Sequence, residues 1–527
     1  MSNNRKLPVG MQDFEDMRTN GYLYVDKTAY IYRLATTGKP YFLCRPRRFG
    51  KSLFLSTLKA YFLGKKELFT GLAIAGLEKE WTEYPVFYFD FNVGVYTGAQ
   101  SLHDTLHTKL HRLEEQWGKD AEEKDIASRL EGLVRRACER TGNKVVVLID
   151  EYDTPLIATM DRPGVNDEMR TLLKGFYGVF KSADAYLRFV FLTGVTKFSK
   201  VSIFSDLNQL RDISMSNTFS GICGISETEL TVNFHPEIAA LAEKQKLTYE
   251  ETLAKLKKHY DGYRFCEDME GTEDIYNPHS LLNAFENKNF ANYWYQTGTP
   301  TFLVKMLKDI NFDIRKIGDG QVSATAEFLT DYRVDNKDPI PVLYQSGYLT
   351  IKGYNEQLNK YYLGFPNEEV KYGFLRNLLP AYAPADCILL NEFYAGNFIE
   401  DLWAGNVDGF MSRMQAMFAS IPYDLSDRSE RHYQLVFYLL FTLMGQFVQT
   451  EVKSAKGRAD AVVKTSDTVF VFEFKMDTNG TAEDALQQID NTGYLIPYIA
   501  DGRKIVKVGA EFSAEERMLS RWITGNS

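Results

Sequence analysis

Cysteine is scarce in this sequence, and no two cysteines stand close enough to form a C-x-x-C pair. The five cysteines lie far apart in a chain of 527 residues, and their number is odd. Cysteine zinc sites need closely spaced cysteines, and disulfide-stapled domains need many cysteines, normally in even number. The sequence therefore predicts a reducing compartment and argues against a cysteine zinc site or a disulfide scaffold.

Long apolar runs are also missing. The first ten residues, MSNNRKLPVG, lack the apolar core of a signal peptide, and the most apolar run, LVFYLLFTLMG, covers only residues 435–445. A helix needs about 20 apolar residues to span a bilayer. We therefore expect no membrane segment and a cytoplasmic protein.

The chain has no excess of basic residues. It contains 61 Lys and Arg against 70 Asp and Glu, which gives a formal net charge of -9. Any contact with nucleic acid must therefore use a local basic patch. Hydrophobic residues make up 44% and charged residues 25%, as in soluble globular proteins, and the length predicts several domains.

Apolar runs alternate with helical patterns in the first part of the chain. We expect strands at 41–44, 86–92, 144–150 and 186–194, and helices at 51–62, 98–117, 121–141 and 165–183. Apolar strands separated by helices predict a parallel sheet with helices on both faces.

Later segments change character twice. A helical, turn-rich segment leads to a helix end, a hairpin and a helix capped by Asn367, which together look winged-helix-like. The last hundred residues read as a helix (428–447), three strands (VQTEVKS, RADAVVKT, TVFVFEFKM), a helix (481–498) and a final strand, KIVKVGAEF. We predict an α/β multidomain protein: a domain built on a parallel sheet (1–225), a helical lid (226–300), a helical, winged-helix-like middle domain (301–420) and an αβββαβ domain (421–527).

The stretch RPRRFGKS (45–52) follows the first expected strand and precedes the first of these helices. A phosphate-binding loop has this context and ends in G-K-[ST]. Lys51 would contact the β- and γ-phosphates, the Ser52 hydroxyl would hold Mg²⁺, and the first N–H groups of the helix would face the phosphates. A basic surface loop followed by an ordinary helix would read the same way.

The usual pattern has a leading glycine, and Arg45 stands in its place. The phosphate cradle must then rest on Gly50, Lys51 and the helix N-terminus. Arg47 and Arg48 are candidates for additional phosphate contacts, or for contacts with a partner subunit or DNA.

A second motif, VVVLIDEYD (145–153), places Asp150 and Glu151 at the carboxyl end of an apolar strand. Ligands bind at that edge of a parallel sheet. Asp150 would support Mg²⁺, and Glu151 would polarise the attacking water. After the next strand, Thr193 or Thr196 would sense the γ-phosphate, unless both belong to a strand-end turn with satisfied hydroxyls.

These motifs resemble the AAA-ATPase-like family, which is related to the archaeal-type P-loop ATPases, and they predict a P-loop NTPase domain over residues 1–225. The resemblance rests on YVDKT (24–28), RPRRFGKS, VVVLIDEYD, TGVTKFSKVSIFSDLN (193–208), YDGYRF (260–265) and YNPHSLL (276–282), in this order, and it covers roughly residues 5–285. It implies ATP binding and the usual roles for Gly50, Lys51, Ser52, Asp150 and Glu151. It also implies that the arginine-rich loop without the leading glycine is a normal form, and that a C-terminal nuclease-fold domain is common.

Asp460, Glu473 and Lys475 stand out in the C-terminal strands. Residues i and i+2 of a strand share a face, so Glu473 and Lys475 project to one side, and Asp460 lies next to Glu473 if the second and third strands pair antiparallel. Two neighbouring carboxylates repel unless a cation bridges them, and Mg²⁺ prefers such oxygen ligands. An E-x-K sequence on an exposed strand is common. The prediction of a metal site therefore depends on all three residues together and on the order of the helices and strands that carry them.

That arrangement resembles the PD-(D/E)XK nuclease superfamily, with a restriction-endonuclease-like fold, although Ala459 stands where many members have proline. The resemblance implies cleavage of a phosphodiester with Mg²⁺ (or Mn²⁺), and Gln488 matches a glutamine often found beside this site. A further acidic ligand would come from Glu430 or Glu451. Contacts with backbone phosphates would come from Lys453, Lys456 and Arg458.

Two functions from different classes fit these motifs. In the first, an ATPase controls a Mg²⁺-dependent DNA nuclease, and RNA stays open as a substrate. In the second, the ATP site is a switch, and the nuclease fold is a non-catalytic binding module. The intact set Asp460, Glu473 and Lys475 favours the first function, and the acidic net charge favours the second. The sequence leaves open whether the chain forms a homo-oligomer.

Overall fold

The computed structural model divides the chain into two compact units. We call Met1–Thr297 with Val322–Glu369 the N-terminal unit, and Gly298–Gln321 with Val370–Ser527 the C-terminal unit. The predicted domain boundaries are finer than this division and stay predictions. The structure describes residues 6–197, 209–294, 301–310, 312–318, 320–330, 338–382, 392–419, 430–445, 449–452, 459–499, 502–516 and 518–526.

A parallel sheet forms the centre of the N-terminal unit, as the sequence predicts. Its order is β2-β3-β4-β1-β5, and every neighbouring pair is parallel. Because β4 lies between β1 and β3, its carboxyl end lies between the basic loop (residues 45–52), which follows β1, and the acidic end of β3 at Asp150. The strands are β1 (Pro40–Cys44), β2 (Val86–Asp90), β3 (Val145–Asp150), β4 (Leu187–Gly194) and β5 (Arg211–Asp212).

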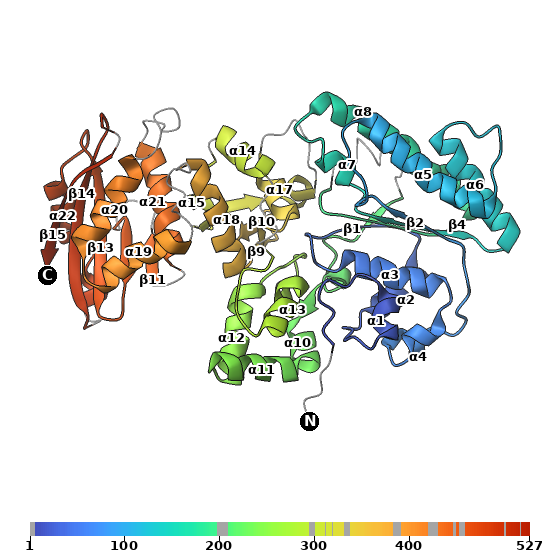
Figure 1. Cartoon of the computed structure of the whole chain (residues 1–527), viewed down its shortest axis with the longest axis horizontal. Coiled ribbons are helices and arrows are strands. Elements are labelled where there is room, and N and C mark those ends of the chain that lie inside the picture. The colour runs from blue at the N-terminus through green and yellow to red at the C-terminus, as the bar shows by residue number, and fades with distance from the viewer. Residues whose placement is uncertain are drawn as a thin grey trace. The chain divides into compact units, whose positions relative to one another are not determined.

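Helices cover both faces of this sheet (Figure 1). One face carries α5 (Ala99–Trp117), α6 (Ile126–Thr141) and α8 (Pro163–Ser182), and the other carries α1 (Phe14–Thr19), α2 (Thr28–Thr37), α3 (Lys51–Phe62) and α4 (Ala73–Leu77). The helix predicted at 121–141 begins later because Asp125 is its N-cap and accepts a hydrogen bond from the Ser128 N–H. Short pieces complete this part: η1 (Lys66–Phe69), α7 (Thr154–Ile157), η2 (Asp184–Tyr186) and η3 (Asn217–Phe219).

A small helical subdomain follows the sheet. It has a core of its own that includes Leu230, Leu241, Leu256 and Phe285. Ser226, Thr248 and Asn277 cap three of its helices with side-chain hydrogen bonds, as their residue types favour. The elements are β6 (Ile225–Ser226), α10 (Glu227–Asn233), α11 (His235–Gln245), α12 (Tyr249–Tyr260), β7 (Ile275–Tyr276) and α13 (Pro278–Asn287).

The predicted helix end, hairpin and helix are present in the middle of the chain. The hairpin is part of a three-stranded antiparallel sheet of order β8-β10-β9, whose short first strand carries too little pattern to be predicted. The elements are β8 (Val322–Ala324), α16 (Ala326–Thr330), α17 (Ile340–Gln345), β9 (Thr350–Asn355), β10 (Lys360–Gly364) and α18 (Glu368–Tyr382).

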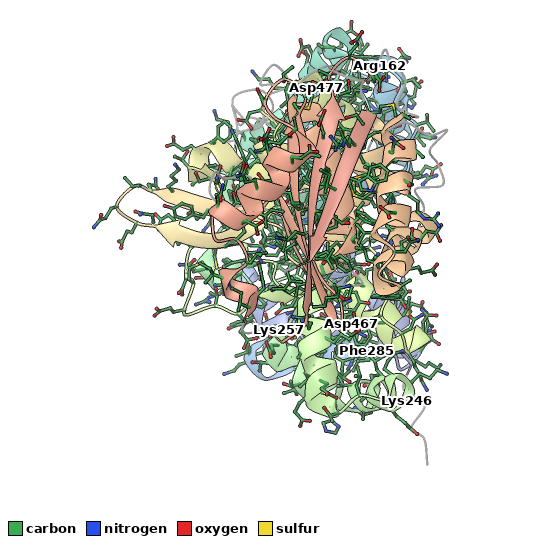
Figure 2. The ribbon with its side chains drawn as sticks, turned by 90° about the vertical axis from the view of Figure 1, so that its left-hand side faces the viewer. Arg162, Lys246, Lys257, Phe285, Asp467 and Asp477 are labelled. Carbon is green, nitrogen blue, oxygen red and sulfur yellow. The ribbon has the colours of Figure 1, made fainter. Side chains whose placement is uncertain are left out.

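A mixed sheet of order β11-β12-β13-β14-β15 forms the C-terminal unit, in which β13 and β14 are parallel and the other neighbours are antiparallel. Figure 2 shows Asp467 and Asp477 at opposite ends of β13. The elements are α14 (Thr301–Asp309), α15 (Arg315–Gly318), α19 (Glu392–Trp403), α20 (Val407–Ala419), α21 (Glu430–Met444), β11 (Gln449–Val452), β12 (Ala461–Lys464), β13 (Thr468–Met476), α22 (Ala482–Asn491), α23 (Ile496–Ile499), β14 (Lys504–Ser513) and β15 (Met518–Asn526).

Two details of the C-terminal prediction are wrong. KIVKVGAEF is not the final strand, because β15 follows and pairs with β14. The helix predicted at 481–498 is broken into α22 and α23. Gly493, with a φ of 71°, adopts the left-handed conformation between them, which glycine tolerates and which ends a helix.

The alternation of side chains along β13 decides what its two faces contact. Phe472 packs against Phe410 of α20 and Phe441 of α21, with ring centroids 5.4 and 5.2 Å apart. Val469 and Val471, on the other face, share a core with Ile489 of α22. Because side chains alternate, Glu473 and Lys475 share the face with the valines and meet α22.

Arg45 anchors the basic loop from the inside. Its side chain is buried, and its guanidinium donates hydrogen bonds to the carbonyl oxygens of Cys44, Ser214 and Phe219, at 2.9, 2.7 and 3.2 Å. The guanidinium also lies 4.1 Å from the ring centroid of Phe265. The position without glycine is therefore occupied by a structural residue.

The YDGYRF segment supports the same loop. The ring of Phe49 packs edge-on against Tyr263 and Phe265, with centroids 4.7 and 5.6 Å apart. The Trp294 indole N–H donates to the Arg47 carbonyl at 3.2 Å. Residues more than two hundred positions away thus fix the loop.

We predict that Arg45→Met destabilises the N-terminal unit by about 3 kcal/mol, because several buried carbonyl groups lose a charged donor. A lower midpoint of thermal unfolding checks this. Arg47→Met is the matched control, since that side chain is exposed and its loss should change the midpoint little. Equal midpoints for the two variants would contradict the anchoring role.

We also predict that Gly509→Ala destabilises the C-terminal unit. A Cβ at this position of β14 would lie 2.3 Å from the Ala482 carbonyl oxygen and 2.6 Å from the Leu486 nitrogen, both in α22. We expect a loss of about 1–3 kcal/mol, measured by thermal unfolding. Gly396→Ala in α19 is the control, because its Cβ meets no atom within 4 Å and should be neutral or stabilising. An unchanged midpoint in Gly509→Ala would rule out this close approach.

Candidate functional site

The basic loop has the backbone of an anion-binding turn. Arg48 and Gly50 adopt left-handed conformations, with φ of 67° and 89°. The helix α3 begins directly after Gly50, and no side chain caps its N-terminus. Such a turn and an uncapped helix start present backbone N–H groups to a negatively charged ligand. A left-handed arginine is uncommon and is typical of functional loops.

Lys51 lies buried beneath this loop. Its ammonium donates to the carbonyl oxygens of Arg45 and Pro46, at 3.1 and 3.3 Å, and lies 3.2 Å from Oε1 of Glu151. Burial acts to lower the pKa of Lys51, but the carboxylates of Glu151, Asp150 and Asp153 outweigh it and raise the pKa. The lysine is therefore held charged at the sheet edge.

Asp150 and Thr193 meet across neighbouring strand ends. The Thr193 hydroxyl donates to Oδ1 of Asp150 at 2.6 Å, and the Tyr88 hydroxyl lies 3.5 Å from Oδ2. Glu151 has a φ of 51°. Its side chain contacts Lys51 and is 18% exposed. The structure thus brings Lys51, Asp150, Glu151 and Thr193 together. Ser52 lies in the first turn of α3, half-buried.

Asp153 is a residue of this site that the sequence analysis did not single out. Its carboxylate accepts from the backbone N–H groups of Val195 and Thr196, at 3.0 and 2.6 Å, and from the Thr196 hydroxyl at 2.6 Å. Burial and the neighbouring Glu151 raise the pKa of Asp153 to about 6. Thr193 and Thr196 therefore both bind acids of the second motif. The third acid of VVVLIDEYD, Asp153, is the sequence feature from which this contact with the end of β4 could have been predicted.

The Arg48 guanidinium contacts Nε2 of His279, near the start of α13. Burial and the Arg48 charge lower the pKa of His279 to about 4. The imidazole is then neutral at pH 7 and accepts a hydrogen bond from Arg48. This contact joins the loop to the helical subdomain, and Arg48 as a nucleotide ligand stays a prediction.

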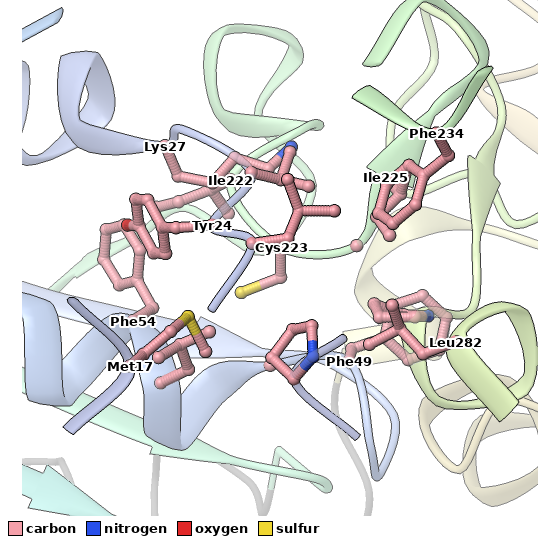
Figure 3. A pocket seen from close by; sticks show the side chains of 17 residues that line it. Met17, Tyr24, Lys27, Phe49, Phe54, Ile222, Cys223, Ile225, Phe234 and Leu282 are labelled. Carbon is pink, nitrogen blue, oxygen red and sulfur yellow. The ribbon is translucent and has the colours of Figure 1, made fainter. Parts of the chain in front are cut away.

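An apolar pocket opens beside Gly50, at the start of α3 (Figure 3). Figure 3 shows Tyr24, Phe54 and Met17 on one side and Phe234, Ile225 and Leu282 on the other. The remaining labelled side chains are Lys27, Phe49, Ile222 and Cys223. The Lys27 ammonium is engaged, since it binds the Gly221 carbonyl oxygen and the Glu229 carboxylate. The pocket therefore offers chiefly shape and apolar surface to a ligand.

In the C-terminal unit, Asp460 directly precedes β12, rather than lying within it as predicted. The register pairs Ala461 with Phe472, which places Asp460 opposite Glu473. One carboxylate oxygen of Asp460 accepts a hydrogen bond from the Phe474 N–H at 2.9 Å. This bond to β13 holds Asp460 beside the ExK segment.

Glu473, Lys475 and Gln488 form one hydrogen-bonded cluster. The Gln488 amide donates to Oε1 of Glu473 at 2.5 Å, and the Lys475 ammonium lies 2.5 Å from the Gln488 carbonyl oxygen and 3.5 Å from Oε1 of Glu473. Burial and the neighbouring Asp460 raise the pKa of Glu473 to about 7, although Lys475 opposes this. Tyr494, which the sequence analysis missed, accepts from the same Gln488 amide at 3.2 Å.

The donor set of this cluster fits a small hard cation. Within the described residues, Oε2 of Glu473 is buried without a hydrogen-bond partner, on the carboxylate that faces Asp460. No group of three or more His, Cys, Asp or Glu side chains in the described part of the chain could hold a metal ion. Two carboxylates suffice for Mg²⁺, which keeps several waters. The side chains of Glu430 and Glu451, and residues Lys453, Lys456 and Arg458, lie outside the described residues.

Across the described residues, no helix combines the length and the apolar character needed to cross a membrane.

Comparisons with known proteins find matches to both ends of the chain. Residues 8–204 match a family model described as predicted AAA-ATPase, and residues 428–522 match a model of the PD-(D/E)XK nuclease superfamily. An uncharacterized protein in the vnfD 5′ region of Azotobacter chroococcum mcd 1 is 37% identical over 523 residues, which cover 97% of each chain. The chain therefore belongs to one family with this Azotobacter protein, and it combines an N-terminal predicted AAA-ATPase domain with a C-terminal domain of the PD-(D/E)XK nuclease superfamily.

Proposed function

We propose that the N-terminal unit binds and hydrolyses ATP. The observation that carries this proposal is the meeting of Lys51, Asp150 and Glu151 at the carboxyl edge of the parallel sheet, beneath an uncapped helix start. The phosphates bind the loop N–H groups and Lys51. Ser52 and Asp150 would hold the Mg²⁺ that accompanies the nucleotide, and Glu151 orients the attacking water.

The apolar pocket beside Gly50 supports a nucleotide rather than a simple phosphate. It begins where the phosphates would lie and is lined on both sides by flat or branched apolar groups. A purine ring stacks well in such surroundings. The pocket therefore takes the base, while the loop takes the phosphates.

We further propose that the C-terminal unit hydrolyses a phosphodiester of DNA. Asp460 and Glu473 would hold Mg²⁺ (or Mn²⁺), which supplies Lewis acidity and a water of lowered pKa when bound. Lys475 stabilises the negative charge that develops on the phosphate, and Gln488 holds Lys475 and Glu473 in place. RNA is the second substrate to be tested, because the chemistry of this cluster does not distinguish the two.

We propose that the ATP site controls this nuclease. The alternative is an ATP-switched binding protein with a non-catalytic nuclease fold, which the formal net charge of -9 favours. The intact carboxylate pair with its lysine and glutamine supports catalysis, because a scaffold needs no pair of neighbouring, repelling acids.

We predict that Lys51→Ala lowers ATP hydrolysis by at least about 100-fold, because the variant loses a preorganised charge at the phosphates. Release of inorganic phosphate measures this. Lys66→Ala, an exposed lysine just after α3, is the control and should hydrolyse ATP at the wild-type rate. Hydrolysis by Lys51→Ala at the wild-type rate would refute the loop assignment.

We predict that Asp460→Asn lowers DNA cleavage by about two orders of magnitude or more, because it removes a charged ligand of the cation. Linear, circular and single-stranded DNA, and RNA, are incubated with Mg²⁺ or Mn²⁺, with and without ATP, and analysed on gels. Asp467→Asn, at the far end of β13, is the control.

Three outcomes of this assay are decisive. Cleavage by the wild type and by Asp467→Asn, but not by Asp460→Asn, supports the nuclease. Intact substrates in every reaction favour the binding-module alternative. Cleavage that is independent of ATP, and equal in Lys51→Ala, contradicts control by the nucleotide site.

A further inference from the structure

The acidic motif at the end of β3 holds the end of β4 at several points. The Tyr152 N–H donates to the Thr193 carbonyl oxygen at 3.0 Å, and the Tyr152 hydroxyl donates to the Thr196 carbonyl oxygen at 2.9 Å. Asp150 binds the Thr193 hydroxyl, and Asp153 binds the Thr196 hydroxyl, as described above. The turn from Thr193 to Lys197 therefore has little freedom relative to the acids.

Close packing at Gly194 limits this turn further. A Cβ at this position would lie 2.6 Å from Oδ1 of Asp153 and 2.6 Å from the ring of Tyr152. The turn can approach the motif only because residue 194 has no side chain. A shift of the turn would therefore disturb Asp153 and Tyr152 directly.

The far end of the turn is held by a residue from another part of the chain. The Lys197 N–H donates to Oε1 of Gln345 at 2.7 Å, and Nε2 of Gln345 donates to the Leu329 carbonyl oxygen at 2.6 Å. Gln345 is the last residue of α17 and is 5% exposed. The Lys197 ammonium separately binds Asp212.

A glutamine is well suited to this position. One end of its amide accepts from a backbone N–H, and the other donates to a backbone carbonyl, so neither group is left unpaired in the interior. An aliphatic side chain of equal length would leave both unpaired. An ionised glutamate would keep only the acceptor.

We propose that Gln345 is a positioning residue of the nucleotide site. It holds the Lys197 N–H and thereby keeps the turn at the end of β4 in the register that aligns Thr193 with Asp150, facing Lys51. The proposal rests on the proposed hydrolysis of ATP and adds a residue from the middle of the chain to that site. Gln345 acts through the turn and touches no reacting atom.

The test compares Gln345→Met with Gln345→Glu. The methionine leaves the Lys197 N–H unpaired, so we expect kcat for ATP hydrolysis to fall about tenfold. We expect an unchanged KM and unchanged affinity for a fluorescent ADP, because Lys51 and the loop keep their contacts. The glutamate keeps an acceptor for the Lys197 N–H and should restore kcat to within about threefold of the wild type. Gln245→Met, which loses a side-chain bond to the Lys288 carbonyl in the helical subdomain, is the control.

Hydrogen exchange of the amides from Thr193 to Lys197 gives a readout that does not need hydrolysis. We expect exchange at least about tenfold faster in Gln345→Met than in the wild type, and near wild-type exchange in Gln345→Glu. If Gln345→Met does not fold, Gln345→Asn replaces it, because the shorter amide cannot reach both partners.

The outcomes separate this proposal from the proposed function. A normal kcat in Gln345→Met overturns the positioning role, and so does an equal fall in both variants, which would assign the effect to the bond with Leu329. If the wild type does not hydrolyse ATP, the proposed function fails, and hydrogen exchange alone decides. In that case, faster exchange in Gln345→Met alone supports the claim that Gln345 fixes the turn from Thr193 to Lys197. Unchanged exchange overturns that claim.

Discussion

The buried guanidinium of Arg45 is the contact on which the loop of the proposed nucleotide site depends. A phosphate loop must hold its N–H groups in one concave arrangement before a ligand arrives, and glycine at the leading position normally allows the required bend. Here the bend lies at Arg48 and Gly50, and Arg45 ties the start of the loop to carbonyl groups of a distant segment. The loop gains stiffness where the usual pattern has freedom. The arginine at position 45 is thus compatible with a phosphate loop.

Both candidate sites meet the same electrostatic problem. In the N-terminal unit, three acids act on the Lys51 ammonium, and in the C-terminal unit two acids, Asp460 and Glu473, are neighbours with one lysine beside Glu473. Each cluster has more acids than bases in a poorly solvated space, so part of the negative charge is not balanced within the cluster. A divalent cation removes this imbalance. Under the proposed function, both sites would therefore use a divalent cation for chemistry at phosphate, although they lie on unrelated folds.

Local sequence patterns predict most of the sheet and helix order. The helix from Lys51 to Phe62 has the predicted bounds, and β3 and β13 are recognisable from unbroken or alternating apolar residues. The short strand β8 and the final strand β15 escape prediction because one has three residues and the other mixes polar and apolar residues without a strong period. The pairing of Asp460 with Glu473 could be predicted because antiparallel register follows from the turn between two strands.

What the sequence could not predict are the contacts made across long separations. The sequence shows Arg45 only as the residue in place of the leading glycine, and nothing local indicates that Ser214, Phe219 and Phe265 enclose it. Asp153 and Tyr494 lie only a few residues after motif residues that the sequence analysis named. Their hydrogen-bond partners nevertheless depend on how whole helices and strands pack. Burial of a polar side chain is a property of the folded chain, and its partners become known only with the topology.

These long contacts have a consequence for how the N-terminal unit responds to a ligand. The loop is held by Trp294 and by the rings of Tyr263 and Phe265, and the end of β4 is held by Gln345. A nucleotide that changes the conformation of the loop must also change contacts in the helical subdomain and in α17. By linkage, if the nucleotide changes the affinity of those segments for a partner by some factor, the partner changes the affinity for the nucleotide by the same factor. A partner that binds the helical subdomain or α17 would therefore act on the proposed nucleotide site through the contacts that hold the loop and the end of β4.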